Sequence, residues 1–83
     1  MASSGRVRIK VIKSALEESL PGCCWKEAQH HWHILPPGGG PAYHLPKGEH
    51  GKKWRAEIER GHIRRLARQF GILEKMEKHI PGL

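Results

Sequence analysis

Long apolar runs are missing from this 83-residue sequence. No window reaches the roughly 20 apolar residues that a bilayer-spanning helix needs, and residues 1–6 do not resemble a signal peptide. We therefore expect no membrane association and a cytoplasmic location. Apolar residues are also scarce, at 37% of the chain. This predicts one small domain with a thin core over residues 6–83, preceded by a disordered N-terminus at residues 1–5.

Cysteine is nearly absent as well. The two cysteines, Cys23 and Cys24, are adjacent, so they fit neither an ordinary loop-closing disulfide nor a CxxC zinc motif. His31 and His33 on one strand face could chelate zinc, but no cysteine or carboxylate stands at a spacing that completes a tetrahedral site. The sequence therefore predicts no metal, no other cofactor and a reduced compartment.

Positive charge, in contrast, is abundant. The chain has 15 lysines and arginines against 8 acidic residues, a formal net charge of +7. Such an excess favours a polyanion as partner, because neutralised phosphates release their condensed counterions. The alternative is a basic protein whose charge only opposes aggregation.

The pattern of apolar residues predicts an α+β protein. Spacings of three and four indicate a helix over residues 7–20, although alternation at its start leaves a strand open. Two short runs at 29–35 and 42–45, separated by proline and glycine, predict a β-hairpin. A short helical turn or irregular link is expected over 54–60. A basic helix follows from residue 61 or 62 to 70, with one or two amphipathic turns over 73–80.

The first strand of the predicted hairpin contains three histidines within four positions. Imidazole exchanges protons near neutral pH, so a histidine can act as the base or the acid in RNA cleavage. With a side-chain period of two, Trp32 and Ile34 face the core on the side of His30, while His31 and His33 face outward. The pattern alone is equally consistent with solvated, non-catalytic strand histidines.

Six cations cluster in the second half of the chain. We expect them to form one continuous face that follows a nucleic-acid backbone. The alternative is the solvated side of an amphipathic helix. The six residues are Lys47, Lys52, Lys53, Arg64, Arg65 and Arg68.

Two stretches carry a resemblance to a known family: AYHLPKGEHG at residues 42–51 and EIERGHIRRLARQFGI at residues 57–72. They resemble the end of the HicA family of small bacterial toxins that cleave mRNA. That end has a strand, a turn with proline and histidine, a Glu-Ile step and a basic helix that closes on Gly-Ile. Upstream, Ala28-Gln29-His30-His31 stands where the family has Gly-Ser-His-His.

The resemblance implies a fold like that of the double-stranded-RNA-binding domain: helix, antiparallel sheet, helix. A short first strand leaves two or three strands in the sheet. It also implies an endoribonuclease that needs no metal, with His30 as general base, His31 beside it and the six cations on phosphates. Trp32 or Tyr43 would stack on a base where exposed. The implied partners are RNA and an antitoxin of the HicB type.

Three other functions stay open. One is an RNA-binding module of the same shape without catalysis. Another is a helix-turn-helix DNA-binding domain built on residues 63–72, although Glu74 and Glu77 would then put carboxylates on the recognition helix, facing phosphates. The third is a protein-interaction domain that binds no nucleic acid.

Overall fold

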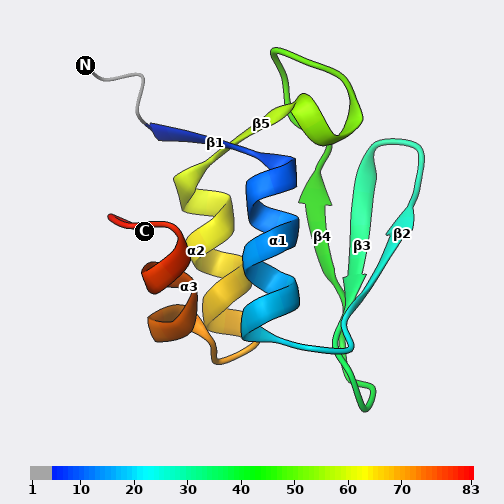
Figure 1. Cartoon of the computed structure of the whole chain (residues 1–83). Coiled ribbons are helices and arrows are strands. Elements are labelled where there is room, and N and C mark those ends of the chain that lie inside the picture. The colour runs from blue at the N-terminus through cyan, green and yellow to red at the C-terminus, as the bar shows by residue number, and fades with distance from the viewer. Residues whose placement is uncertain (1–4) are drawn as a thin grey trace.

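The computed structural model describes residues 5–83 and contains two antiparallel sheets and three α-helices (Figure 1). The α+β class is therefore confirmed. Of the N-terminus predicted to be disordered, residues 1–5, residues 1–4 fall outside the described residues. No helix in the described part is long and apolar enough to cross a membrane. The elements in chain order are β1 (Arg6–Arg8), α1 (Ile9–Ser19), β2 (Cys24–Glu27), β3 (His31–Leu35), β4 (Tyr43–Pro46), a 3-10 turn η2 (Lys53–Arg55), β5 (Glu57–Glu59), α2 (Arg60–Gln69) and α3 (Leu73–His79).

The larger sheet has three strands in the order β2-β3-β4. The central strand β3 alternates as expected. Trp32 and Ile34 are 3% and 0% exposed, whereas His31, His33 and Leu35 face the other side of the sheet. Trp32 pairs with Glu27 on β2 and with Leu45 on β4. The expected hairpin and its inward-facing pair are confirmed, and of the two sheet sizes left open the structure has the larger.

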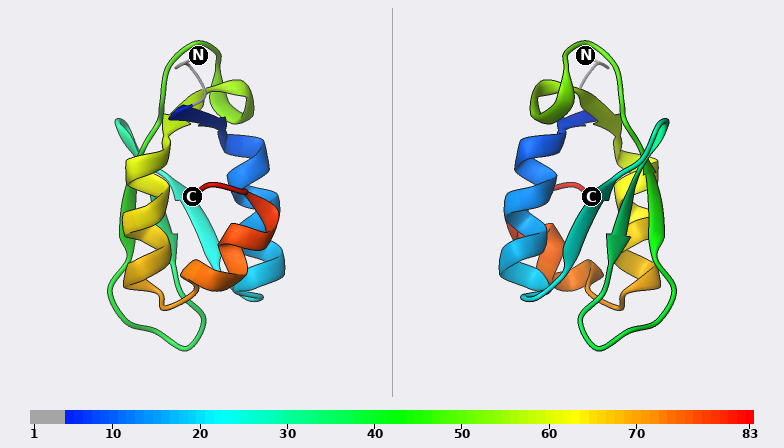
Figure 2. Two further views of the ribbon diagram at one scale, coloured as in Figure 1. Left: turned by 90° about the vertical axis from the view of Figure 1, so that its left-hand side faces the viewer. Right: turned by 90° about the vertical axis from the view of Figure 1, so that its right-hand side faces the viewer.

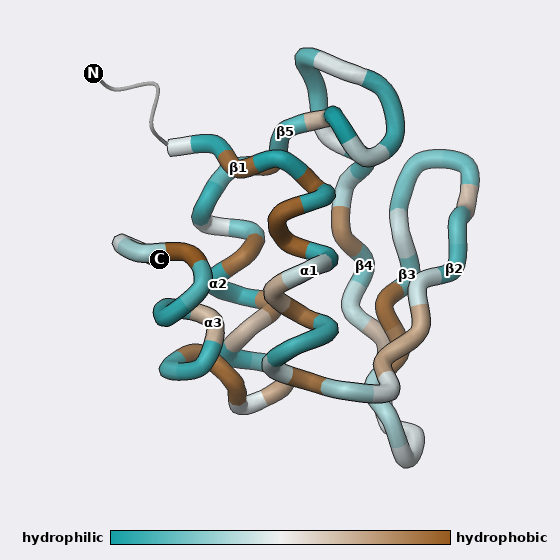
Figure 3. Tube along the Cα trace, viewed as in Figure 1, coloured by the Kyte–Doolittle hydropathy of each residue, from teal (hydrophilic) through white to brown (hydrophobic). Residues whose placement is uncertain are grey.

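Helices α1 and α2 cover one face of this sheet (Figure 2). Hydrophobic and hydrophilic stretches alternate along both helices, as an amphipathic helix requires (Figure 3). α3 packs against both helices. The resulting core includes the fully buried side chains Ile9, Ile12, Leu16, Ile34, Leu45, Ile63, Leu66 and Met76.

A second, two-stranded sheet joins β1 to β5, and sequence reasoning did not predict this pairing. The helix expected from residue 7 begins at Ile9, because the preceding Arg-Val-Arg pairs with Glu-Ile-Glu. Val7 and Ile58 are buried opposite each other, while arginines lie across from glutamates. Such cross-strand pairs stabilise even short strands. Because the two strands are antiparallel, α1 and α2 begin at opposite ends of this small sheet (Figure 1).

The long loop between β4 and β5 folds back on β5. Glu49 and Glu57 exchange two backbone hydrogen bonds, of 3.1 and 2.7 Å. Gly48 allows this close approach, since its φ is +84° and a Cβ there would lie 2.5 Å from the Glu57 carbonyl oxygen. The fold therefore requires glycine at this position.

We expect Gly48→Ala to lower the free energy of unfolding by about 3 kcal/mol, from backbone strain and the carbonyl clash together. Gly38→Ala is the matched control. Gly38 also has a positive φ, +80°, but a Cβ there would meet nothing within 4 Å, so we expect a loss of about 1 kcal/mol. Urea denaturation followed by tryptophan fluorescence measures both, and equal losses would contradict the close approach.

Candidate nucleic-acid interface

His30 lies in the tight turn between β2 and β3. The Ala28 amide donates a hydrogen bond to the His31 carbonyl at 2.9 Å, so Gln29 and His30 are the two turn residues. Both are exposed. His31 is the first residue of β3 and is also exposed. His30 and His31, the two histidines expected to be catalytic, are therefore neighbours where β3 begins, and both are exposed to solvent.

The outer face of the sheet carries a row of histidines. The His33 and His44 rings are stacked, with centroids 4.3 Å apart and planes at 24°. The His31 ring lies 6.4 Å from that of His44. Sequence reasoning did not single out His44. Its apolar neighbour Leu45 was the available signal, because a buried Leu45 places His44 on the outer face of the sheet.

Two lysines of the β4–β5 loop reach the end of β2, next to the β2–β3 turn. Lys47 Nζ lies 3.0 Å from one carboxylate oxygen of Glu27, and Lys53 Nζ lies 3.9 Å from the other. Glu27 is the last residue of β2. The hydrogen bond from Lys47, together with the positive charge of both lysines, lowers the pKa of Glu27. Lys52 is exposed in the same loop. Two cations, Lys47 and Lys53, therefore lie at the end of β2, next to the turn that carries His30.

The arginines form a second cationic group on α2. Arg65 and Arg68 are exposed and Arg64 is half-buried, on the side of the helix opposite Ile63, Leu66 and Ala67. The helix contains no acidic residue. Figure 2 shows η2 above α1, whereas α2 lies on the other side of the helical layer. No hydrogen bond, ion pair or ring contact among the described residues joins the two groups, so the single continuous face remains a prediction.

The three tryptophans pack together, and Trp32 is the inner one. At 3% exposure it belongs to the core, so the condition for stacking on a base is not met. Tyr43 is half-buried, and its hydroxyl donates a hydrogen bond to the His62 carbonyl at 3.2 Å. Trp54 is half-buried and stacks on Trp32 with centroids 4.7 Å apart. Sequence reasoning missed Trp54, although it directly follows two lysines.

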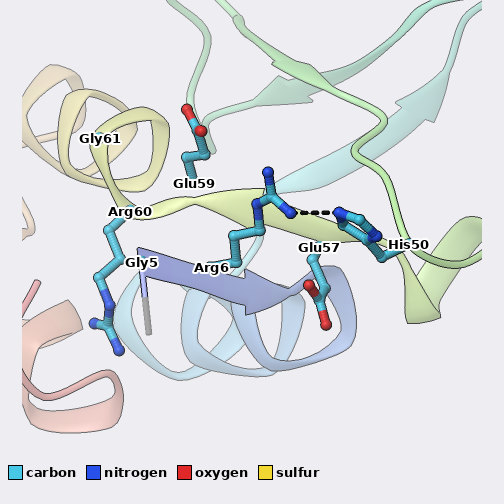
Figure 4. Close-up of a pocket in the computed structure, with 7 residues that line it drawn as sticks. All are labelled: Gly5, Arg6, His50, Glu57, Glu59, Arg60 and Gly61. Atoms are coloured by element: carbon cyan, nitrogen blue, oxygen red, sulfur yellow. Dashed lines mark hydrogen bonds between the residues drawn. The ribbon is translucent and has the colours of Figure 1, made fainter. Parts of the chain in front are cut away.

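A shallow open pocket lies beside the two-stranded sheet (Figure 4). Arg6 contacts His50 across it, and the side chains of Glu57 and Arg60 extend away from this contact. Two arginines and two glutamates balance the charge, so this pocket suits a polyanion less well than the lysine loop does. Its lining residues are Gly5, Arg6, His50, Glu57, Glu59, Arg60 and Gly61.

Histidine, cysteine and acidic side chains are the groups that could hold a metal ion, and the cysteines could supply a thiolate. Within residues 5–83, no group of three or more histidine, cysteine or acidic side chains is arranged to hold a metal ion. Burial, and then the negative charge of Glu17, raises the pKa of the Cys23 thiol. This favours the unreactive protonated form.

Comparisons with family models, curated proteins and solved structures gave no match. The resemblance to the HicA family therefore rests on the sequence motifs alone.

The Glu27 contact predicts a specific pH dependence. Because the folded state lowers the pKa of this carboxyl, its contribution to stability is complete above the usual glutamate range and disappears as the pH falls through the lowered pKa. We therefore expect Glu27→Gln to reduce stability at pH 7 by a small amount that vanishes towards pH 3.

Urea titrations across this pH range measure the difference between Glu27→Gln and the parent. Glu18→Gln is the control, since Glu18 is an exposed glutamate of α1 without an ion pair among the described residues. A difference that stays constant from pH 7 to pH 3 would contradict the role given to Glu27.

Proposed function

We propose that this protein binds RNA through its loop lysines and α2 arginines and cleaves it, without a metal ion, beside His30. The observation that carries the proposal is the meeting of two segments far apart in the sequence. The turn with exposed His30 and the loop with Lys47 and Lys53 converge at Glu27 (Figure 1). A proton acceptor thus stands beside phosphate-binding cations.

The chemistry requires a base, an acid and a positive charge. His30 takes the proton of a ribose 2′-hydroxyl, and the 2′-oxygen attacks the adjacent phosphorus. The bond from phosphorus to the 5′-oxygen breaks, and that oxygen receives a proton from a second acid, for which His31 is the neighbouring candidate. The loop ammonium groups stabilise the negative charge that develops on the phosphoryl oxygens. The products are a cyclic 2′,3′-phosphate and a 5′-hydroxyl.

RNA is favoured over DNA for two reasons. The proposed reaction needs a 2′-hydroxyl, which DNA lacks. In addition, α3 would be the recognition helix if α2 and α3 formed a helix-turn-helix pair, and its exposed Glu74 and Glu77 would oppose phosphates. The HicA resemblance adds a second partner to the proposal, an antitoxin of the HicB type that covers the histidine and the basic surface.

Cleavage is tested by incubating a structured mRNA with the parent and with His30→Ala in EDTA. Cleavage and retardation are read on the same gel. We expect the parent to cleave, and we expect His30→Ala to lose at least 100-fold in rate, in line with the roughly 10²–10⁴-fold that general acid–base catalysis contributes, while it retards the RNA equally. His79→Ala, an exposed histidine on α3, is the control and should cleave normally.

Equal retardation by all three proteins without any cleavage would leave an RNA-binding module and remove the catalytic role of His30. Absence of both retardation and cleavage would reject the proposal as a whole.

Phosphate contacts by α2 are tested through the salt dependence of binding. Each phosphate contact on a single strand contributes about 0.7 to the slope of log K against log salt. Replacing Arg64, Arg65 and Arg68 together by alanine should therefore reduce that slope by about 2. Replacing Lys75 and Lys78 on α3, both exposed, should change it little. Equal slopes for the arginine variant and the parent would exclude α2 from the interface.

A further inference from the structure

Trp54 has two lysines over its ring, whereas buried Trp32 has one, Lys47, at 5.9 Å. Trp54 stacks on buried Trp32 with an interplanar angle of 21°, so Trp32 supports its ring from within the core. The ammonium groups of Lys13 and Lys53 lie 5.6 and 5.8 Å from the ring centroid. Each of the two lysines is also paired with a glutamate, Lys13 with Glu17 and Lys53 with Glu27. A ligand that approaches the Trp54 ring therefore meets the ammonium groups of Lys13 and Lys53.

A small open pocket lies next to this ring. It is bounded by Lys10, Lys13, Ser14 and Glu17 of α1 together with Trp54. Its volume of about 250 Å³ is below the roughly 300–1,000 Å³ of sites that enclose a whole drug-sized ligand. A single flat ring therefore fits it better than a large compact ligand. With two lysines and one glutamate, its lining keeps a net positive charge, which favours a ligand that carries negative charge beside that ring.

We propose that Trp54 is the stacking platform for an unpaired base of RNA, with Lys13 and Lys53 on the flanking phosphates. This inference rests on the RNA binding proposed above and specifies its substrate class as single-stranded RNA. Aromatic stacking with cations along the backbone is how single strands are held without sequence preference. A base inside a duplex is already stacked on both faces, so it cannot use the platform.

The arrangement is pre-ordered for this purpose. Because Trp32 fixes the plane of the Trp54 ring, little side-chain entropy remains to be lost when a base stacks on it. The ammonium groups need only move from the ring and their glutamates to phosphates. Cation–π contacts of exposed lysines are weak, so a phosphate readily displaces them.

The test compares a labelled single-stranded 2′-O-methyl oligouridine with a 2′-O-methyl RNA duplex, using fluorescence anisotropy. The 2′-O-methyl group removes the attacking hydroxyl, so cleavage cannot interfere. We expect Trp54→Leu to weaken binding of the single strand about 10-fold and to change duplex binding less than about 2-fold. Trp54→Phe keeps a smaller aromatic ring and should lie between Trp54→Leu and the parent.

Trp25→Leu is the matched control for folding. Trp25 belongs to the same cluster, 6.0 Å from Trp54, and is also half-buried, but within the described residues no lysine is placed over its ring. We expect this variant to lose stability as Trp54→Leu does, yet to bind the single strand like the parent. Circular dichroism and urea titration verify that each variant is folded.

Quenching gives a second measurement that a structural role would not change. In a Trp25→Phe background, single-stranded RNA should quench the emission of Trp54, and the additional change Trp54→Phe should abolish the quenching. Equal loss of single-strand and duplex binding in Trp54→Leu, or no loss in either, would overturn the stacking platform while leaving RNA binding intact. A parent protein that binds neither RNA would reject the proposed function and this inference with it.

Discussion

The alternation of side chains along β3 is the constraint on which the rest of the structure depends. Trp32 and Ile34 must face the helices because they supply the buried surface of the central strand. The same period places His31 and His33 on the outer face. His30 precedes the strand, and its place in the β2–β3 turn rather than this alternation leaves it exposed. The packing of one strand thus decides which histidines are available for chemistry.

Much of this could be predicted from the sequence, because period and turn residues are local signals. The hairpin, the basic helix and the terminal amphipathic helix were predicted from such signals. The pairing of β1 with β5 was not, because Arg-Val-Arg and Glu-Ile-Glu each hold one apolar residue and acquire their meaning only when they meet. Trp54 was missed for a similar reason, since its contact with Trp32 joins residues 22 positions apart.

The distribution of charge follows from the fold rather than from the composition. The structure divides the six cations predicted to form one face between the β4–β5 loop, which reaches the β2–β3 turn, and the outer side of α2. Glu27 holds two of the lysines in place. Under the proposed RNA binding, a carboxylate in that position would compete with a phosphate for the same ammonium groups and so lower the affinity.

The central claim is that the β2–β3 turn, the lysine loop and α2 together face RNA. An NMR titration of the ¹⁵N-labelled protein with single-stranded 2′-O-methyl RNA tests it most directly. We expect the amide chemical shifts to change at residues 27–31, 47–55 and 60–69, whereas those of α3 stay unchanged. Changes confined to α3 or to the charge-balanced pocket at His50, or no changes at all, would contradict it.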